Sequence, residues 1–138
     1  MRMKYHHLVE EAPRERDTRQ RRAIRKVLET SGRPLSPREV LKGAHRHAPG
    51  LGLATVYRNL KALVGGGRIV AVELPGEAAR YEPAGKGHHH HFRCRGCDRL
   101  FEVMGCRPAA AGRPPRGFQV ESHEVVWYGR CASCAGAA

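Results

Sequence analysis

Apolar residues recur at helical spacing in three successive stretches of the N-terminal half. The first stretch starts near Thr18, a candidate N-cap, and carries Ile24, Val27 and Leu28 on one face of a basic segment. It ends at Gly32-Arg33-Pro34, where glycine and proline interrupt helical geometry. The pattern predicts a first helix with a basic face that is free to contact phosphate groups.

The second stretch has a well-marked start. Ser36 is a typical N-cap, Pro37 suits the first helical position, and Glu39 completes a capping box. The helix is expected to stop before Pro49-Gly50.

The third stretch runs from about Leu53 to Val64 and ends at three glycines. Val56, Leu60 and Leu63 repeat at i, i+4 and i+7, so they should face the core. The same helix leaves polar side chains for solvent or for a partner, namely Thr55, Tyr57, Arg58 and Lys61.

A hairpin follows, with strands expected over 68–74 and 79–82 around a Pro-Gly turn. Two packed helices, a short third helix with polar reach and a two-stranded ribbon indicate a winged helix-turn-helix. We expect an α+β chain with a DNA-binding domain over 1–83, a hinge at 84–87 and a second domain over 88–138.

The second domain is predicted to have short strands over 88–94, 99–103, 117–121 and 124–128. It has about fifty residues and few large apolar side chains, so we expect that burial alone does not offset its ordering entropy. A structural metal or a second subunit would stabilise it.

The composition favours an acidic polymer as partner. The formal net charge is +12 and the calculated pI is about 10.3. No apolar run approaches the roughly 18 to 20 residues of a membrane-spanning helix, and the N-terminus lacks the apolar core of a signal peptide. We therefore expect a cytoplasmic protein that binds double-stranded DNA and has no membrane segment.

Two Cys-x-x-Cys pairs stand at the start and the end of the second domain. Thiolates are preferred zinc ligands, and two pairs supply a tetrahedral set. The pairs are Cys94 with Cys97 and Cys131 with Cys134. A structural zinc site is expected; a redox function for the two pairs is the alternative, and no βαβ context supports it.

Four consecutive histidines precede the first cysteine pair. In an extended strand His88 and His90 point to one side, while His89 and His91 point to the other. We expect Glu82 and Glu102 to join the second pair of histidines. His123 and Cys106 are expected to join the first pair, so one strand would contribute to two regulatory metal sites. The alternative is an ordinary polar strand.

The segment Gly52-Leu53-Ala54-Thr55-Val56-Tyr57-Arg58-Asn59-Leu60 resembles the ferric uptake regulator family. The Tyr81-Glu82 pair, the four histidines and both cysteine pairs match the family in the same order. The resemblance covers about residues 16–134. It implies a homodimeric, metal-activated repressor with a winged helix, a hinge and a small α/β dimerisation domain.

The resemblance also implies roles for single residues. Tyr57 and Arg58 would contact the major groove and Arg16 the minor groove, while Arg19 and Thr55 are further DNA-binding candidates. The four paired cysteines would hold structural Zn²⁺. The hinge site would consist of Glu82, His89, His91 and Glu102. Family members usually add a ligand from the DNA-binding half, but here Arg33-Pro34 occupies that place, and only His6, His7 or a water could substitute.

The other regulatory site departs from the family in its chemistry. His88, His90 and His123 match family ligands, and the fourth is normally a glutamate. Counting forward from Cys97 places that position at Ala109, and counting back from His123 places it at Cys106; a short deletion reconciles the two. Cys106 is therefore expected to replace the carboxylate, with a free buried thiol as the alternative. A thiolate shifts the preference toward zinc over iron or manganese.

The leading hypothesis is a zinc-responsive repressor of the zinc-uptake-regulator kind. Zn²⁺ would be the regulatory metal, with Fe²⁺ or Mn²⁺ as alternatives, and a peroxide sensor is a further alternative within the family. A zinc-dependent hydrolase is disfavoured because the sequence has no His-Glu-x-x-His motif. A zinc-storage or zinc-transfer protein is the remaining rival.

Overall fold

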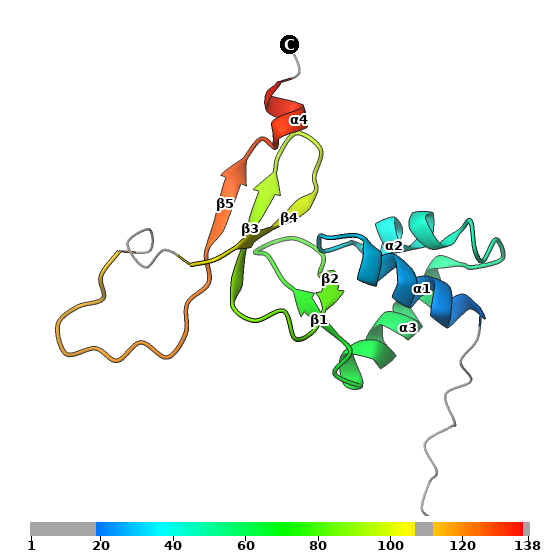
Figure 1. The fold of residues 1–138 in the computed structure, drawn as a ribbon, viewed down its shortest axis with the longest axis horizontal. Helices are drawn as coiled ribbons and strands as arrows, with labels where there is room; N and C mark the ends of the chain where they lie inside the picture. Colours follow the sequence, from blue (N-terminus) through cyan, green and yellow to red (C-terminus); the bar gives the residue numbers. More distant parts are fainter. Residues whose placement is uncertain (1–18, 107–111, 137–138) are drawn as a thin grey trace, which may run out of the picture.

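A computed structural model describes residues 19–106 and 112–136, so Arg16, His6, His7 and Ala109 lie outside the described part of the chain. A helical half and a sheet half lie side by side (Figure 1). Among the described residues, no helix has both the length and the apolar character needed to cross a membrane.

Three helices form the core of the N-terminal half. They are α1 (Arg19–Thr30), α2 (Pro37–Ala44) and α3 (Leu53–Gly65). The predicted start of α2 is confirmed, because the Ser36 hydroxyl accepts from the Glu39 N–H and the Glu39 carboxylate accepts from the Ser36 N–H, both at 3.2 Å. Among the predicted core positions, Val27 is partly buried, and the fully buried ones are Ile24, Leu28, Val56, Leu60 and Leu63. Val40 of α2 is buried with them.

The predicted hairpin consists of β1 (Ile69–Val72) and β2 (Arg80–Pro83), which pair antiparallel. Leu35, in the α1–α2 connection, exchanges two backbone hydrogen bonds with Tyr81, at 2.9 and 2.8 Å. This bridge fixes β2 against the helices. It also positions Glu82, which is only 2% exposed, on the side of the sheet half.

The sheet half has β3 (His89–Cys94) at its centre, between β4 (Leu100–Met104) and β5 (Val126–Gly129). β4 runs antiparallel to β3, and β5 runs parallel to it. The parallel register places Cys94 opposite Gly129, so the chain after β5 arrives beside the first cysteine pair. A short helix, α4 (Ala132–Ala135), then carries the last cysteine.

The strand predicted over 117–121 is wrong. These residues form a turn and an extended connection without strand pairing, within a long excursion away from the sheet (Figure 1). The alternation of apolar and polar residues is present, and Phe118 and Val120 are 69% and 59% exposed. A strand needs a neighbour, and the described part of one chain offers none here.

Candidate metal centres and nucleic-acid surface

The four paired cysteines come together at one end of the sheet. Their sulfur atoms lie within 4.8 Å of one another, and Cys97 Sγ is 3.9 Å from Cys131 Sγ. Two sulfurs bound tetrahedrally to zinc at about 2.3 Å each are separated by roughly 3.8 Å. The cluster therefore has the dimensions of a four-thiolate zinc site.

The ionisation of these thiols also fits a cation site. The Cys131 N–H donates to Cys94 Sγ at 3.2 Å, and this hydrogen bond lowers the pKa of Cys94 to about 6, which favours the thiolate form that binds metal. Hydrogen bonding with Cys131 and Cys94 raises the pKa of Cys134 to about 12. Four thiolates cannot ionise together without a positive charge among them, and Zn²⁺ would supply that charge.

Gly96 is a residue of this cluster that the sequence reasoning missed. A Cβ atom at this position would lie 2.8 Å from Cys134 Sγ and 2.9 Å from its Cβ. Only glycine therefore lets the turn between Cys94 and Cys97 approach α4 this closely. The signal in the sequence was a glycine inside a Cys-x-x-Cys motif, but the close approach depends on the fold.

A second cluster lies where the two halves meet. Glu82 on β2 directs one carboxylate oxygen to His89 Nε2, at 2.7 Å, and the other to His91 Nε2, at 3.4 Å. The His89 Nδ1–H donates to the Gly87 carbonyl at 2.9 Å, which fixes the ring and leaves Nε2 toward the carboxylate. The structure thus brings together three of the four residues expected at the hinge site.

Glu102, the fourth expected residue, stands at the margin of this cluster. It faces His91 across the β3–β4 ladder, and its Oε1 is 3.8 Å from His89 Nε2. That oxygen is buried and has no hydrogen-bond partner among the described residues. The other oxygen pairs with Lys86 Nζ at 3.2 Å. Arg33 does not contribute, because it pairs with Glu39 at 2.5 Å.

The charges in the hinge cluster reinforce one another. Burial would raise the pKa of Glu82, but hydrogen bonds with His91 and His89 outweigh it and lower the pKa. Burial would lower the pKa of His89, but the Gly87 carbonyl and the Glu82 carboxylate raise it. A metal at these ligands would compete with a proton on His89, so metal affinity should fall as the pH falls.

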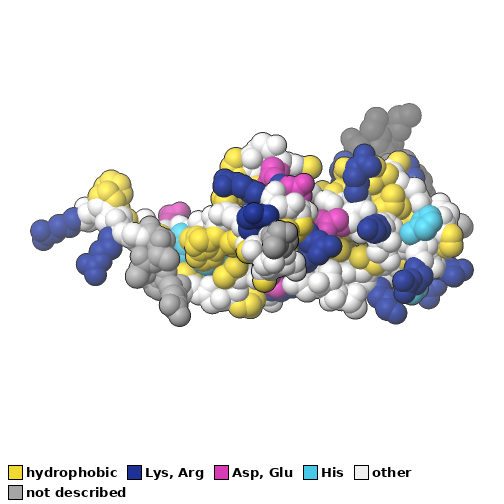
Figure 2. Space-filling model, turned by 90° about the horizontal axis from the view of Figure 1, so that it is seen from above, with side chains coloured by type: hydrophobic (Ala, Val, Ile, Leu, Met, Phe, Trp, Pro, Cys, Tyr) yellow, Lys and Arg dark blue, Asp and Glu magenta, His cyan; other side chains and the backbone are white. Residues whose placement is uncertain are grey.

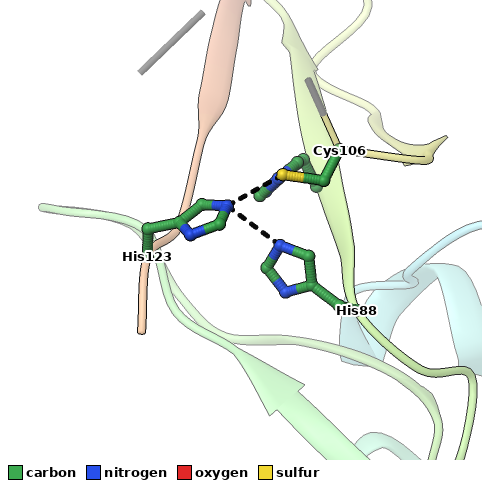
Figure 3. A group of neighbouring side chains, drawn as sticks. His88, Cys106 and His123 are labelled. Carbon is green, nitrogen blue, oxygen red and sulfur yellow. Dashed lines mark hydrogen bonds between the residues drawn. The ribbon is translucent and has the colours of Figure 1, made fainter. Parts of the chain in front are cut away.

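The third cluster occupies the opposite side of β3. His123 Nε2 lies 3.0 Å from His88 Nε2 and 3.0 Å from Cys106 Sγ, and the three side chains converge from separate segments (Figure 3). His90 completes the group, with all four ligand atoms within 4.8 Å of one another. The structure thus brings together all four residues expected at this site.

His90 is the buried member of this group. Its Nδ1 accepts from the Val125 N–H at 3.2 Å, which fixes the ring. The neutral ring then carries its proton on Nε2, which is buried without a partner among the described residues, so metal binding through Nε2 would require that proton to move to Nδ1 and the Val125 hydrogen bond to break. Burial and the neighbouring imidazoles lower the pKa of His90, which favours the neutral form that binds metal. Three imidazoles and one thiol form a complete four-ligand set.

Among the expected DNA contacts that the structure describes, Thr55, Tyr57 and Arg58 lie on α3 and Arg19 lies on α1. Tyr57 is 49% exposed, and Arg58 is exposed and donates to the Thr55 hydroxyl at 3.0 Å. Arg19 is exposed at the start of α1. These side chains are free to reach a nucleic acid.

A network of ion pairs that the sequence reasoning did not find ties the wing to the sheet half. Glu77, in the β1–β2 turn, accepts from Arg93 Nε on β3 at 2.7 Å and from Arg80 Nη1 at 3.5 Å. Arg80 Nη2 donates to the Asp98 carbonyl at 3.0 Å, and Arg93 Nη2 pairs with the Asp98 carboxylate at 3.2 Å. The sequence did not indicate this network, because the positions of charged residues along the chain do not show which of them meet in the fold.

The ferric uptake regulator family model matches residues 14–128. The chain belongs to this family. Its fold is therefore the α+β arrangement expected from the sequence, a winged helix-turn-helix domain followed by a dimerisation domain. The predicted membership of the ferric uptake regulator family is confirmed.

Relatives within the ferric uptake regulator family include regulators named for iron and for zinc. The chain is 32% identical to transcriptional regulator FurA of Mycobacterium tuberculosis, over 87% of this chain and 83% of that protein. It is 33% identical to the zinc uptake regulation protein of the same organism, over 86% and 94%. The chain is thus a metal-responsive transcriptional regulator, not an enzyme.

A solved structure supports the same assignment. The Helicobacter pylori ferric uptake regulator Fur, described as having three functional metal binding sites, has a TM-score of 0.67 and 27% sequence identity. The match covers 86% of this chain and 81% of that one.

Proposed function

We propose that this chain is a zinc-responsive repressor that binds a palindromic operator as a homodimer. The observation that carries the choice of zinc is the convergence of Cys106 with His88, His90 and His123. A thiolate among imidazoles is a softer donor set than one with a carboxylate, and it favours zinc over iron or manganese. The relatives do not decide the metal, because a ferric uptake regulation protein of Campylobacter jejuni and the zinc uptake regulation protein match with similar identity, 30% and 33%.

The hinge cluster suggests how metal would affect DNA binding. Glu82 belongs to the wing, whereas His89 and His91 belong to the sheet half. Shared coordination by these residues would favour one arrangement of the two halves and hence one spacing of the recognition helices in a dimer. Without metal the protein would sample other spacings and bind DNA weakly. We assign residues 1–83 to the DNA-binding domain, 84–87 to the hinge and 88–138 to the dimerisation domain.

Unpaired sheet edges and exposed apolar side chains support the homodimer. Within the described residues, β4 and β5 have no partner on their outer edges. Exposed apolar residues lie on these strands, namely Met104, Trp127 and Tyr128, and on the excursion between them, namely Phe118 and Val120. A second copy would cover this surface. We further propose that the protein works in the cytoplasm, where thiols stay reduced and DNA is accessible.

Operator binding in a panel of buffered metals tests the proposal. A duplex is first selected from a random library by the zinc-loaded protein, and its affinity is then measured with Zn²⁺, Fe²⁺ and Mn²⁺. Zinc at micromolar or lower free concentration should tighten binding by about tenfold or more. Cys106→Ser should require more zinc, and Cys106→Asp should shift the preference toward Fe²⁺ or Mn²⁺.

The same panel separates the alternatives. Tightening by Fe²⁺ or Mn²⁺ but not by Zn²⁺ in the wild-type chain would exclude zinc sensing. Bound iron together with 2-oxo-histidine after peroxide treatment would indicate a peroxide sensor. A storage or transfer protein would keep its cellular effect in Tyr57→Ala and Arg58→Ala, whereas a repressor would lose it.

A further inference from the structure

A cavity of about 830 Å³ lies between the first two helices and the turn that follows β3. α1 and α2 form one wall, and Cys97, Asp98 and Arg99 contribute to the other. No residue of the two histidine clusters lines it, and neither do Tyr57 and Arg58 of the recognition face. It shares Cys97 with the four-cysteine cluster and Lys26 with the basic face of α1, but it is separate from both histidine clusters and from the exposed face of α3.

The lining of this cavity is strongly basic. Three charged residues of the lining already have partners. Arg33 pairs with Glu39, which also lines the cavity, and Asp98 pairs with Arg93 on β3. Four further cations make no side-chain hydrogen bond or ion pair with any described residue, namely Lys26, Lys42, Arg46 and Arg99. Lys and Arg side chains are also prominent over the middle and the helical half of the molecule seen from above (Figure 2). Cations that face one hollow repel each other unless an anion joins them.

Arg80 adds an independent observation. This guanidinium lines the cavity and is 8% exposed. Nη1 and Nη2 have acceptors in Glu77 and Asp98, but Nε has none among the described residues. A buried N–H group without an acceptor is costly, so the Arg80 guanidinium is one acceptor short, and an anion would reach Nε only if the side chain shifts toward the cavity.

We propose that this cavity binds a small anion carrying two or more phosphate groups. Lysine and arginine are the usual phosphate ligands, and four exposed ones line this hollow without counterions among the described residues. The hollow has the volume of small-molecule sites, roughly 300–1,000 Å³. A DNA duplex would instead contact the exposed face of α3. Three residues of this helix, Tyr57, Arg58 and Lys61, line a separate depression.

Such an anion would bridge the two halves of the chain. Lys26 and Lys42 belong to the helical half, while Arg99 precedes β4 in the sheet half. In this same arrangement Glu82 is within hydrogen-bonding distance of His89. The anion should therefore favour the arrangement that the hinge ligands require, and anion and metal should raise each other's affinity by the same factor. This coupling rests on the proposed metal-dependent function, whereas the anion site does not.

Calorimetric titration of the zinc-loaded full chain with fructose 1,6-bisphosphate, which binds zinc weakly, tests the site. We expect saturable binding of one probe per chain. Lys42→Glu and Arg99→Glu should each weaken it about tenfold or more, since each removes a charge-assisted contact and adds repulsion. Arg38→Glu is the matched control, because Arg38 is exposed on α2 outside the cavity. Circular dichroism and zinc content check that each variant is folded.

Three results would overturn the proposal. The first is the absence of binding at millimolar probe, and the second is an equal loss in Arg38→Glu, which would indicate general charge attraction. The third is a loss of non-operator duplex binding in Lys42→Glu and Arg99→Glu without any bisphosphate binding, which would make the cavity a DNA backbone contact. If the bisphosphate binds but zinc has no effect on operator affinity, the anion site stands and the proposed function fails.

Discussion

Because Gly96 has no side chain, the two cysteine pairs can approach each other closely in the four-cysteine cluster. The turn from Cys94 to Cys97 packs directly on α4. A side chain at position 96 would therefore collide with Cys134, which is one of the expected zinc ligands. The backbone conformation is not the reason, because Gly96 does not have a positive φ. Space alone excludes larger residues.

We predict that Gly96→Ala weakens zinc retention. The added methyl group would have to displace Cys134, and overpacking of this kind typically costs about 1–3 kcal/mol. The variant should release zinc faster to a chromophoric chelator and unfold at a lower temperature. Gly50→Ala is the control, because nothing lies within 4 Å of a Cβ at Gly50. Wild-type release kinetics in Gly96→Ala would show that the turn can move without cost.

Residue chemistry was visible in the sequence wherever it depends on local spacing. The alternation of His88 to His91 predicted two faces of one strand, and the structure places the rings in two separate groups. The partners of charged residues were not visible. Lys86 pairs with Glu102 and Arg93 with Glu77 through contacts between elements, and sequence spacing does not determine such contacts.

At the scale of elements, α2 illustrates a helix whose start is fixed by side chains. Burial would raise the pKa of Glu39, but hydrogen bonds from Arg33 and from the Ser36 backbone lower it below the ordinary value of 4.5. A carboxylate with a lowered folded pKa stabilises the protein above its unfolded pKa. That contribution is lost as the pH falls through the folded value.

Two substitutions should therefore respond differently to pH. Ser36→Ala removes the cap and should cost about 1 kcal/mol of unfolding free energy both near neutrality and in acid. Glu39→Gln should destabilise the protein at about pH 7, and its deficit relative to wild type should shrink below about pH 4.5. Urea unfolding of the two variants and the wild type across this range measures both effects. A pH-independent deficit in Glu39→Gln would mean that its charge does not matter.

Helices were more predictable than strands because helical pairing is local. All three N-terminal helices begin and end within a few residues of the patterns that predicted them. The β3–β5 pairing joins residues more than thirty positions apart, in parallel, and no local signal predicts that register. The strand prediction for segment 117–121 was wrong for the converse reason. The segment has the alternating pattern of a strand, but the described part of the same chain does not contain a strand that pairs with it.

At the scale of the whole molecule, two kinds of contact favour one arrangement of the halves. The Glu77, Arg80, Arg93 and Asp98 network needs no metal, whereas the Glu82, His89 and His91 cluster would be completed by one. The network keeps the hinge ligands near each other before metal arrives. A metal then has less conformational entropy to offset, which would raise the apparent affinity of the site.

The exposed segment 117–121 leads to the last prediction, which concerns assembly. Phe118 and Val120 alternate with polar residues, as in a strand that buries one face, yet both are more than half exposed in a single chain. If this face pairs with a second copy, Phe118→Asp should raise the dimer dissociation constant by about tenfold or more, since burying one large apolar side chain contributes roughly 1.5–3 kcal/mol. Sedimentation velocity over a concentration series measures the change.

Gln119→Asp provides the matched control, because it introduces the same charge at the neighbouring position on the opposite face of an extended segment. The control should remain dimeric at concentrations where Phe118→Asp is monomeric. Since a palindromic operator is read by two recognition helices at once, Phe118→Asp should also lose operator affinity while its zinc content is unchanged. Equal dimerisation by the two variants would place the interface elsewhere, on the outer edges of β4 or β5.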